Sequence, residues 1–347
     1  MTAPMTVPPP AAEAPRRAVC ILGLGLIGGS LGRALLPTRQ VGGWSPGEDS
    51  RRLAAAAGFA VADDLPGALR WADERDAIVV LAAELTAFTE LLRGIARYAP
   101  HSLLTDVGSV KTMVSQQVST ITPQARYVGG HPMAGTAESG FGAGSAELFR
   151  GRTWVTTLAE HTDPLAWAEV AAMAIDTGAR VVPTTDREHD AAVARISHLP
   201  HLMALTLAQA GEQGGPLALR LAAGSFADGT RVAATRPELI RAMCENNIEA
   251  LVNALDDALA MLGVGRASLA STRSIATAAT LGHQARLQFE RQRDRRDSGG
   301  TLLTLTDPTV DQLLDVGASG GDVVGVGLGQ GGSPIEVRAE LPENPAP

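Results

Sequence analysis

The sequence predicts an α/β protein: a Rossmann-type, doubly wound parallel sheet followed by an all-helical domain and a small C-terminal α+β segment. Three observations support this fold class. Short apolar strands alternate with helical stretches in the first half of the chain, a glycine-rich turn joins the first strand to the first helix, and residues 186–294 are helical almost throughout. At 347 residues, the chain exceeds the roughly 100–200 residues of one domain, so we expect at least two.

The first strand is expected at residues 18–22, where an apolar run enters the glycine turn, and a helix follows over 30–36. Residues 77–81 form a continuous apolar run, which is typical of a parallel strand buried on both faces. The other elements expected in this domain are strands at 41–44, 102–105, 154–158 and 179–183 and a helix over 51–57.

The helical stretch has three breaks, at Gly214–Pro216, Thr235–Pro237 and Gly263–Gly265. Many of its faces carry little charge, so we expect it to bury surface against a second subunit in a homodimer. The C-terminal segment is expected to form a strand, a helix and two more strands, at 301–305, 309–316, 323–327 and 335–341. The sequence leaves open whether this segment is a truncated regulatory-type module or a flap that stabilises a dimer.

These patterns divide the chain into a disordered leader (1–17), a dinucleotide-binding domain (18–185), a helical substrate and dimerisation domain (186–296) and a C-terminal segment with a disordered end (297–347). The leader lacks the apolar core of a signal peptide, and no apolar stretch reaches the roughly 20 residues of a membrane span. We therefore expect a cytoplasmic protein without a membrane partner. Its two cysteines are too few for a disulfide framework.

The charge pattern argues against a nucleic-acid partner. The formal net charge is −8, and the one basic cluster, Arg291–Arg296, is interrupted by an acid. Neutralising a phosphate backbone needs a concentrated basic surface, which this sequence does not predict. A small anionic substrate remains compatible, because one well-placed arginine suffices for a carboxylate.

The glycine turn predicts a nicotinamide dinucleotide site. Gly23, Gly25 and Gly28 have the G-x-G-x-x-G spacing between a strand and a helix, with Leu26 and Ile27 inside the motif. Such glycines allow the tight turn, the approach of the pyrophosphate to the backbone and close helix–strand packing, while the helix N-terminus attracts the phosphates. Because this motif directly follows the first strand, we expect NAD or NADP here.

The end of the second strand gives no clear preference between the two cofactors. An acid at this position would hydrogen-bond the adenosine ribose and repel a 2′-phosphate. Here the position falls on Ser45, with acids a few residues later and Arg51 beyond them. NAD is slightly favoured, and NADP stays an alternative.

Polar motifs follow the predicted strands and break the helices, at residues 105–111, 129–136, 197–201 and 224–231. Together with the glycine motif they resemble the prephenate dehydrogenase family, which includes the arogenate enzymes. The shared motifs, in order, are "GLGLIGGS", "D-x-GSVK", "GGHPMAG", "SHLPH" and a Thr-Arg pair. The resemblance extends to about residue 294. It implies an oxidoreductase of tyrosine biosynthesis that converts prephenate to 4-hydroxyphenylpyruvate by oxidative decarboxylation.

The resemblance also implies residue roles. His131 matches the catalytic histidine that takes the proton of the substrate's C4 hydroxyl, and Ser109 matches the serine that orients it and reaches the nicotinamide ribose. Arg231 matches the residue that binds a substrate carboxylate. Further matches in the substrate site are His198, His201, Ser197 and Gly224; Ser197 is also expected as a helix cap.

Some features are predicted not to be catalytic. We interpret Lys111 as structural or electrostatic. His198 and His201 have no evident third ligand, so no metal is expected. Ala137 stands where many relatives have an acid, and Ile240 where some have an aromatic residue, so neither gating by Glu138 nor tyrosine inhibition is transferred.

Three other functions are alternatives to this one. Arogenate, or another amino-substituted prephenate, is an alternative substrate that the sequence does not separate from prephenate. A β-hydroxyacid dehydrogenase would need a catalytic lysine in the second domain, and residues 186–294 contain none. A non-catalytic, cofactor-binding regulatory protein would not need His131, Ser109 and Arg231 together.

Overall fold

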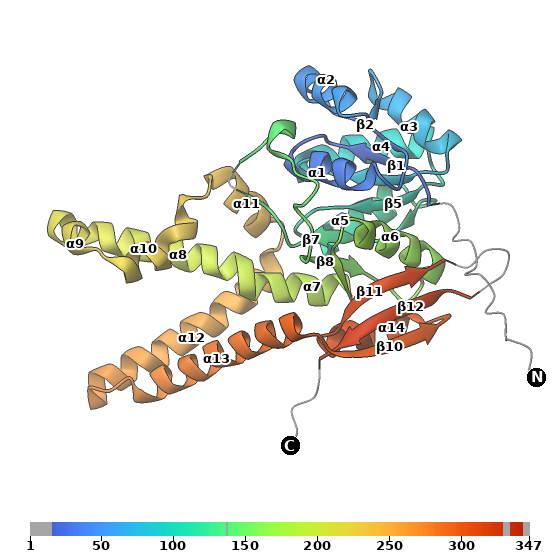
Figure 1. The fold of residues 1–347 in the computed structure, drawn as a ribbon. Coiled ribbons are helices and arrows are strands. Elements are labelled where there is room, and N and C mark those ends of the chain that lie inside the picture. The colour runs from blue at the N-terminus through green and yellow to red at the C-terminus, as the bar shows by residue number, and fades with distance from the viewer. Residues whose placement is uncertain (1–15, 137, 329–333, 343–347) are drawn as a thin grey trace, which may run out of the picture.

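The computed structural model describes residues 16–136, 138–328 and 334–342 (Figure 1). Nearly all of the predicted leader, the last five residues and Ala137 therefore lie outside the described residues. Arg17, near the end of the predicted leader, is already anchored to the body of the protein. Its guanidinium pairs with Asp76 at 2.6 Å and also with Glu169.

The first sheet consists of six parallel strands in the order β3-β2-β1-β4-β5-β6. This is the strand order of a dinucleotide-binding Rossmann domain, with the reversal of strand order between β1 and β4. The predicted fold class is confirmed. The strands are β1 (Val19–Leu22), β2 (Val41–Trp44), β3 (Ala60–Val61), β4 (Ile78–Leu81), β5 (Leu103–Asp106) and β6 (Arg126–Tyr127).

Side chains alternate between the two faces of this sheet, as strand geometry requires. Val19 and Ile21 of β1 face the cluster that contains α1 and α6, whereas Cys20 and Leu22 face the cluster that contains α3, α4 and α5. Both faces are covered, which explains the continuous apolar runs in the sequence. The helices are α1 (Leu26–Leu35), α2 (Glu48–Ala56), α3 (Leu65–Glu74), α4 (Phe88–Tyr98), α5 (Thr112–Ile121) and α6 (Pro164–Asp176).

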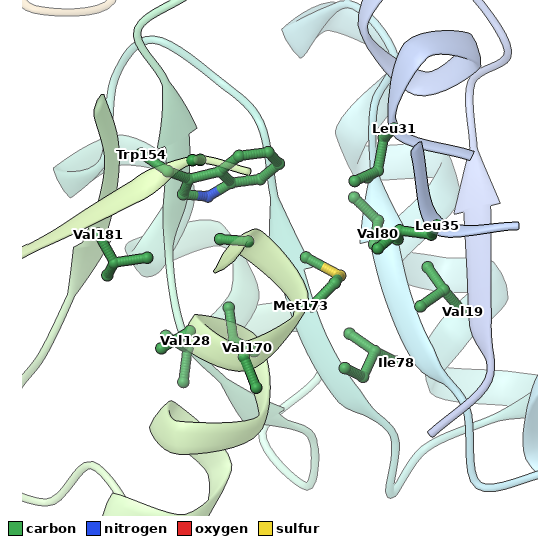
Figure 2. Packing of buried hydrophobic residues seen from close by; sticks show 14 of the residues in the cluster. Val19, Leu31, Leu35, Ile78, Val80, Val128, Trp154, Val170, Met173 and Val181 are labelled. Carbon is green, nitrogen blue, oxygen red and sulfur yellow. The ribbon is translucent and has the colours of Figure 1, made fainter. Parts of the chain in front are cut away.

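A second six-stranded sheet, in the order β10-β12-β11-β9-β8-β7, lies beside the first. Residues 154–158 and 179–183, which we expected to be the last strands of the first domain, form β8 and β9 of this second sheet. Helix α6 packs between the two sheets: Met173 and Val170 lie between Val19 of the first sheet and Trp154 of the second (Figure 2). The strands of the second sheet that precede the helical region are β7 (Gly130–Pro132), β8 (Thr153–Thr157) and β9 (Arg180–Thr184).

The C-terminal segment has the predicted elements but is not a separate module. β11 pairs with β9 through Val323 and Val181, so the segment extends the second sheet. Arg180 bonds Asp322 at 2.8 Å and also Glu340, which ties β9 to β11 and β12. The elements are β10 (Thr301–Thr306), α14 (Val310–Ala318), β11 (Asp322–Gly327) and β12 (Glu336–Leu341).

The helical region leaves the body as one continuous rod. It begins at α7 (Asp186–Val193), passes through a π turn over Ala194–His198, and continues as α8 (Leu199–Gln213). Pro200 has no N–H and its ring would clash with an α-helical carbonyl one turn earlier, so the wider π turn accommodates it. The remaining helices are α9 (Gly215–Leu221), α10 (Gly224–Thr230), α11 (Pro237–Glu245), α12 (Ile248–Thr272) and α13 (Ala276–Ser298).

Helices α8 to α13 project from the body as an arm (Figure 1). Along the 25 residues of α12, only Leu251 and Ala254 are buried, whereas Leu259, Met261 and Leu262 are more than half exposed. The protomer thus leaves a large apolar surface uncovered on this arm. Within the described residues, no helix is long and apolar enough to span a bilayer.

Candidate active site

The glycine turn between β1 and α1 has the geometry that a dinucleotide needs. Gly23 has a φ of +112°, and a Cβ there would lie 2.5 Å from the Ala82 carbonyl group, so only glycine fits. A Cβ on Gly28 would lie 2.0 Å from the oxygen of Gly23, whereas a Cβ on Gly25 would meet nothing within 4 Å. The backbone at Gly25 is therefore open to a ligand.

Helix α1 begins directly at this opening. Its N-cap is Gly25, which provides no side-chain hydrogen bond to the first turn, and no acid lies there. The N–H groups of Leu26 and Ile27 thus point out of the helix end, where a pyrophosphate is stabilised by hydrogen bonds and by the helix dipole. The residues present fit the group that the sequence predicts.

The strand end that decides between the two cofactors lies at Trp44 and Ser45. Arg51 folds back over this loop and donates to the carbonyl oxygens of Ser45 at 2.7 Å and Pro46 at 2.9 Å. The indole N–H of Trp44 is buried without a hydrogen-bond partner in the described structure. No acid takes the ribose-binding position at the end of β2, as the sequence indicated.

A buried ion pair holds β7, the strand that carries His131. Lys111, the only lysine of the sequence, is fully buried and pairs with the equally buried Asp106 at the end of β5. Its ammonium also donates to the carbonyl oxygen of Gly130 at 2.6 Å, and Asp106 accepts from the Gly130 N–H at 3.1 Å. Burial and the neighbouring Asp106 raise the pKa of Tyr127, whose hydroxyl donates to the same carboxylate. Lys111 therefore acts structurally, as expected.

His131 begins a chain of three titratable groups. Its Nδ1 lies 2.8 Å from Nε2 of His189 on α7, and Nδ1 of His189 lies 2.9 Å from Oδ1 of Asp190. His189 and Asp190 are buried, whereas His131 is partly exposed. Burial, together with His189, Lys111 and His198, holds the pKa of His131 well below its usual value, against the opposing effect of Asp190. His131 is therefore neutral at physiological pH.

Asp190 is the centre of this network. Its carboxylate accepts the N–H groups of Lys111 and Thr112, both at 2.8 Å, and so caps α5 from another element. Burial raises the pKa of this carboxyl, but the hydrogen bonds from His189, Thr112 and Lys111 outweigh that effect and lower it to about 2. Asp190 is consequently ionised at any pH where the protein works.

Asn247, the N-cap residue of α12, links this network to His198. Its amide nitrogen donates to the backbone oxygen of Asp190 at 2.8 Å and lies 3.2 Å from Nδ1 of His198. Burial lowers the pKa of His198 to about 4, so His198 is also neutral. Since the amide donates, Nδ1 of His198 accepts, and the ring proton of His198 lies on Nε2.

The structure brings only some of the predicted residues into direct contact. Among the described residues, no hydrogen bond joins Ser109 to His131, and Nδ1 of His131 is paired with His189. The expectation that Ser197 caps a helix is wrong, because the helical rod is continuous at this residue. The backbone carbonyl oxygen of Ser197 accepts a hydrogen bond from Nδ1 of His201 at 2.8 Å.

Gly224 and Arg231, two other residues predicted for the substrate site, lie on the arm. Gly224 starts α10, and Arg231 begins a short 3₁₀ turn (Arg231–Ala234) that packs against α8. Both residues are exposed in the protomer. No described hydrogen bond or ion pair connects either one to His131. In the described part of the chain, no cluster of three or more His, Cys, Asp or Glu side chains could hold a metal ion.

Sequence reasoning missed His189, Asp190 and Asn247. A signal for the first two was present, because Thr185 and Glu188 form a capping box that marks the start of a helix. His189 and Asp190 thus lie in the first turns of a helix that follows a strand, close to a predicted ligand site. Asn247 had no such signal, since only the tertiary fold brings α12 against α7.

A Rossmann domain with an open glycine turn, joined to a helical domain through a buried histidine network, defines a nicotinamide-dependent dehydrogenase of two-domain type. Comparison with known proteins identifies the family to which it belongs. Residues 36–183 match the nucleotide-binding domain of prephenate dehydrogenase and residues 185–273 its dimerization domain. The chain belongs to the prephenate dehydrogenase family, which confirms the predicted family.

Two curated relatives show how far the likeness extends. A cyclohexadienyl dehydrogenase from Zymomonas mobilis is 35% identical over 73% of this chain and 88% of its own length. A prephenate dehydrogenase from Bacillus subtilis is 32% identical over 69% of this chain, but the match spans only 66% of that protein, slightly less than two thirds.

Solved structures agree in fold. A Corynebacterium glutamicum protein, provisionally assigned as a prephenate dehydrogenase, is 46% identical, with a TM-score of 0.76 over 80% of this chain and 88% of that one. A Synechocystis arogenate dehydrogenase is 29% identical, with a TM-score of 0.70 over 78% of this chain and 99% of that one.

Proposed function

We propose that this protein is a prephenate dehydrogenase that oxidatively decarboxylates prephenate to 4-hydroxyphenylpyruvate with NAD as hydride acceptor. The observation that carries the proposal is the neutral His131, whose Nδ1 is occupied by His189. Its Nε2 makes no hydrogen bond to any described residue, so it can meet a substrate hydroxyl. The match to both family domains supports the same reaction.

In this reaction His131 removes the proton from the C4 hydroxyl of prephenate. As the proton leaves, the C4 hydrogen departs as hydride, the ring carboxylate leaves as CO2, and the ring becomes aromatic. Bound NAD supplies the hydride acceptor. Aromatisation provides the driving force, so the protein's contribution is to position the ring and to accept a proton.

The anionic groups of the substrate need cations. Arg231 is exposed in the protomer and has no described partner, so its guanidinium can form a bidentate contact with a carboxylate. His198, with its proton on Nε2, is suited to donate a hydrogen bond to the substrate. Ser109, Ser197, His201 and Gly224 are proposed as further contacts of the same site.

NAD is proposed to bind along Gly23–Gly28, with its adenosine ribose near Ser45. An Aquifex aeolicus prephenate dehydrogenase structure contains NAD and hydroxyphenyl propionate, an aromatic carboxylate. That protein is 23% identical to this chain, so it supports the fold, while the choice of NAD rests on the family and on the open glycine turn.

Arogenate is the second candidate substrate, favoured by the similarity to the Synechocystis enzyme and to the cyclohexadienyl dehydrogenase. The test is to offer prephenate and arogenate, each with NAD and with NADP, and to follow reduced cofactor at 340 nm. We expect the highest kcat/KM for prephenate with NAD. No absorbance gain in any combination would refute the proposal, and a higher kcat/KM for arogenate would replace the substrate.

A further inference from the structure

We propose that His189 is a positioning residue that, fixed by Asp190, sets the tautomer of His131 and shares the proton which His131 receives. This inference rests on the proposed function, because it explains how His131 becomes a competent base. None of the sequence motifs that carry the family resemblance includes His189 or Asp190.

The tautomers follow from the ionised carboxylate. Asp190 can only accept, so Nδ1 of His189, at 2.9 Å, carries a proton and donates it. In the proposed arrangement this is the one ring proton of His189, so its Nε2 has a lone pair that accepts from Nδ1–H of His131 at 2.8 Å. A neutral His131 with its proton on Nδ1 has its lone pair on Nε2. That is the form that can take a proton from a hydroxyl.

The same chain distributes the charge that catalysis creates. When the C4 hydroxyl proton binds Nε2 of His131, the imidazolium can pass its Nδ1 proton to Nε2 of His189. His189 would then be a cation held by Asp190, and His131 would be neutral with its proton on Nε2. The proton count is unchanged: one proton leaves the substrate, and one is gained by the histidine pair.

Four charged or titratable groups surround His131 and set its proton affinity. His189 and Asp190 come from α7, Lys111 from the start of α5, and His198 from the π turn. Asp190 alone favours the protonated imidazole, and the other three disfavour it. Among the described residues only His189 bonds the ring directly, so its replacement tests the proposal with the least change elsewhere.

Two variants separate positioning from a structural role. In His189→Leu the bond to His131 is lost and both tautomers become populated. The kcat should therefore fall at least about 10-fold, but by no more than the roughly 10²–10⁴ that acid–base catalysis provides, while KM for NAD stays within about twofold. In His189→Gln the side-chain oxygen can accept from Nδ1–H, so kcat should recover to within about fivefold of the wild type.

The pH profile gives a second reading. In His189→Gln the proton that His131 receives cannot move on to residue 189, where Asp190 would stabilise it, so the acid limb of kcat/KM should move to lower pH. A Leu variant that keeps kcat within twofold would overturn the proposal. So would a Gln variant that melts like the wild type but recovers no activity, or one whose acid limb does not move.

A measurement without substrate separates this inference from the proposed function. The protein contains seven histidines, so imidazole ¹⁵N spectra are tractable, with His131 assigned from a His131→Asn variant. We expect a protonated Nδ1 and an unprotonated Nε2 for His131 in the wild type. A proton on Nε2 would overturn the relay even if the enzyme is active, whereas the expected tautomer in a protein that oxidises neither substrate would uphold the relay and reject the function.

Discussion

At the scale of single residues, the surroundings set the protonation of three groups in the site: Asp190, His131 and His198. Asp190 stays ionised because three N–H groups bond it, while His131 and His198 stay neutral because burial penalises their cations. The sequence could predict His131 through the family motif "GGHPMAG" that contains it. It could not predict the state of His131, because that state depends on partners 58 and 59 residues away in the chain.

The lowered pKa of His131 leads to a prediction about pH. The base form of His131 is required, and a pKa below the usual 6.5 keeps that form dominant at mildly acidic pH. The logarithm of kcat/KM should therefore stay flat from pH 7.5 down through 6.5 and fall only at lower pH. Steady-state rates in a series of buffers of constant ionic strength would check this. A limb centred at or above pH 6.5 would contradict it.

Stability has its own dependence on pH, of known sign. The pKa of His198 is about 4 in the folded protein and about 6.5 in a model peptide, so the unfolded chain binds the proton first. The unfolding free energy should then decrease as the pH falls from about 6.5 towards 4. Urea unfolding at several pH values measures this. The matched control, His198→Gln, should lose part of that pH dependence, and an unchanged slope would argue against a buried neutral His198.

At the scale of elements, periodicity predicted most helices and strands, including the four elements of the C-terminal segment. Periodicity did not predict two features, the pairing of the strands in the second sheet and the continuous helical rod. The partner of a strand is not encoded in its own residues, so the pairing of β11 with β9 and the second sheet were not predicted. The continuous rod through Pro200 was also missed, because a proline normally marks a helix start, and only the π turn removes the clash.

The buried ion pair of Lys111 and Asp106, which joins β5 to β7, leads to a prediction about stability. Lys111→Met removes the cation and leaves Asp106 as a buried unpaired charge, so the protein should lose about 3–5 kcal/mol of unfolding free energy. Adding Asp106→Asn keeps an acceptor for Gly130 and removes the charge, so the double variant should be more stable than Lys111→Met alone. Urea unfolding measures both, and a Lys111→Met variant of wild-type stability would show that the pair is dispensable.

At the scale of the whole molecule, the arm of α8 to α13 exposes an apolar surface that is suited to contact with a second chain. The sequence indicated this through weakly charged helices, and the family model that covers residues 185–273 is a dimerization domain. The exposed leucines of α12 form a surface that a second copy of the chain would cover in a symmetric dimer. We propose that this arm is the homodimer interface.

Sedimentation or light scattering can test the dimer. The wild type should have the mass of two chains, and the double variant Leu259→Glu, Leu262→Glu should shift to the mass of one chain, because it places charges in an apolar interface. The control is Leu165→Glu at the exposed start of α6, away from the arm, which should remain dimeric. A monomeric wild type, or a dimeric double variant, would contradict the assignment.

The most direct measurement uses prephenate that carries deuterium at C4, with NAD as cofactor. We expect that each molecule of CO2 released is accompanied by one molecule of reduced cofactor containing that deuterium, and that His131→Asn loses this turnover while still binding NAD. Deuterium found in water, CO2 released without reduced cofactor, or a His131→Asn variant of near-normal rate would contradict the central claim.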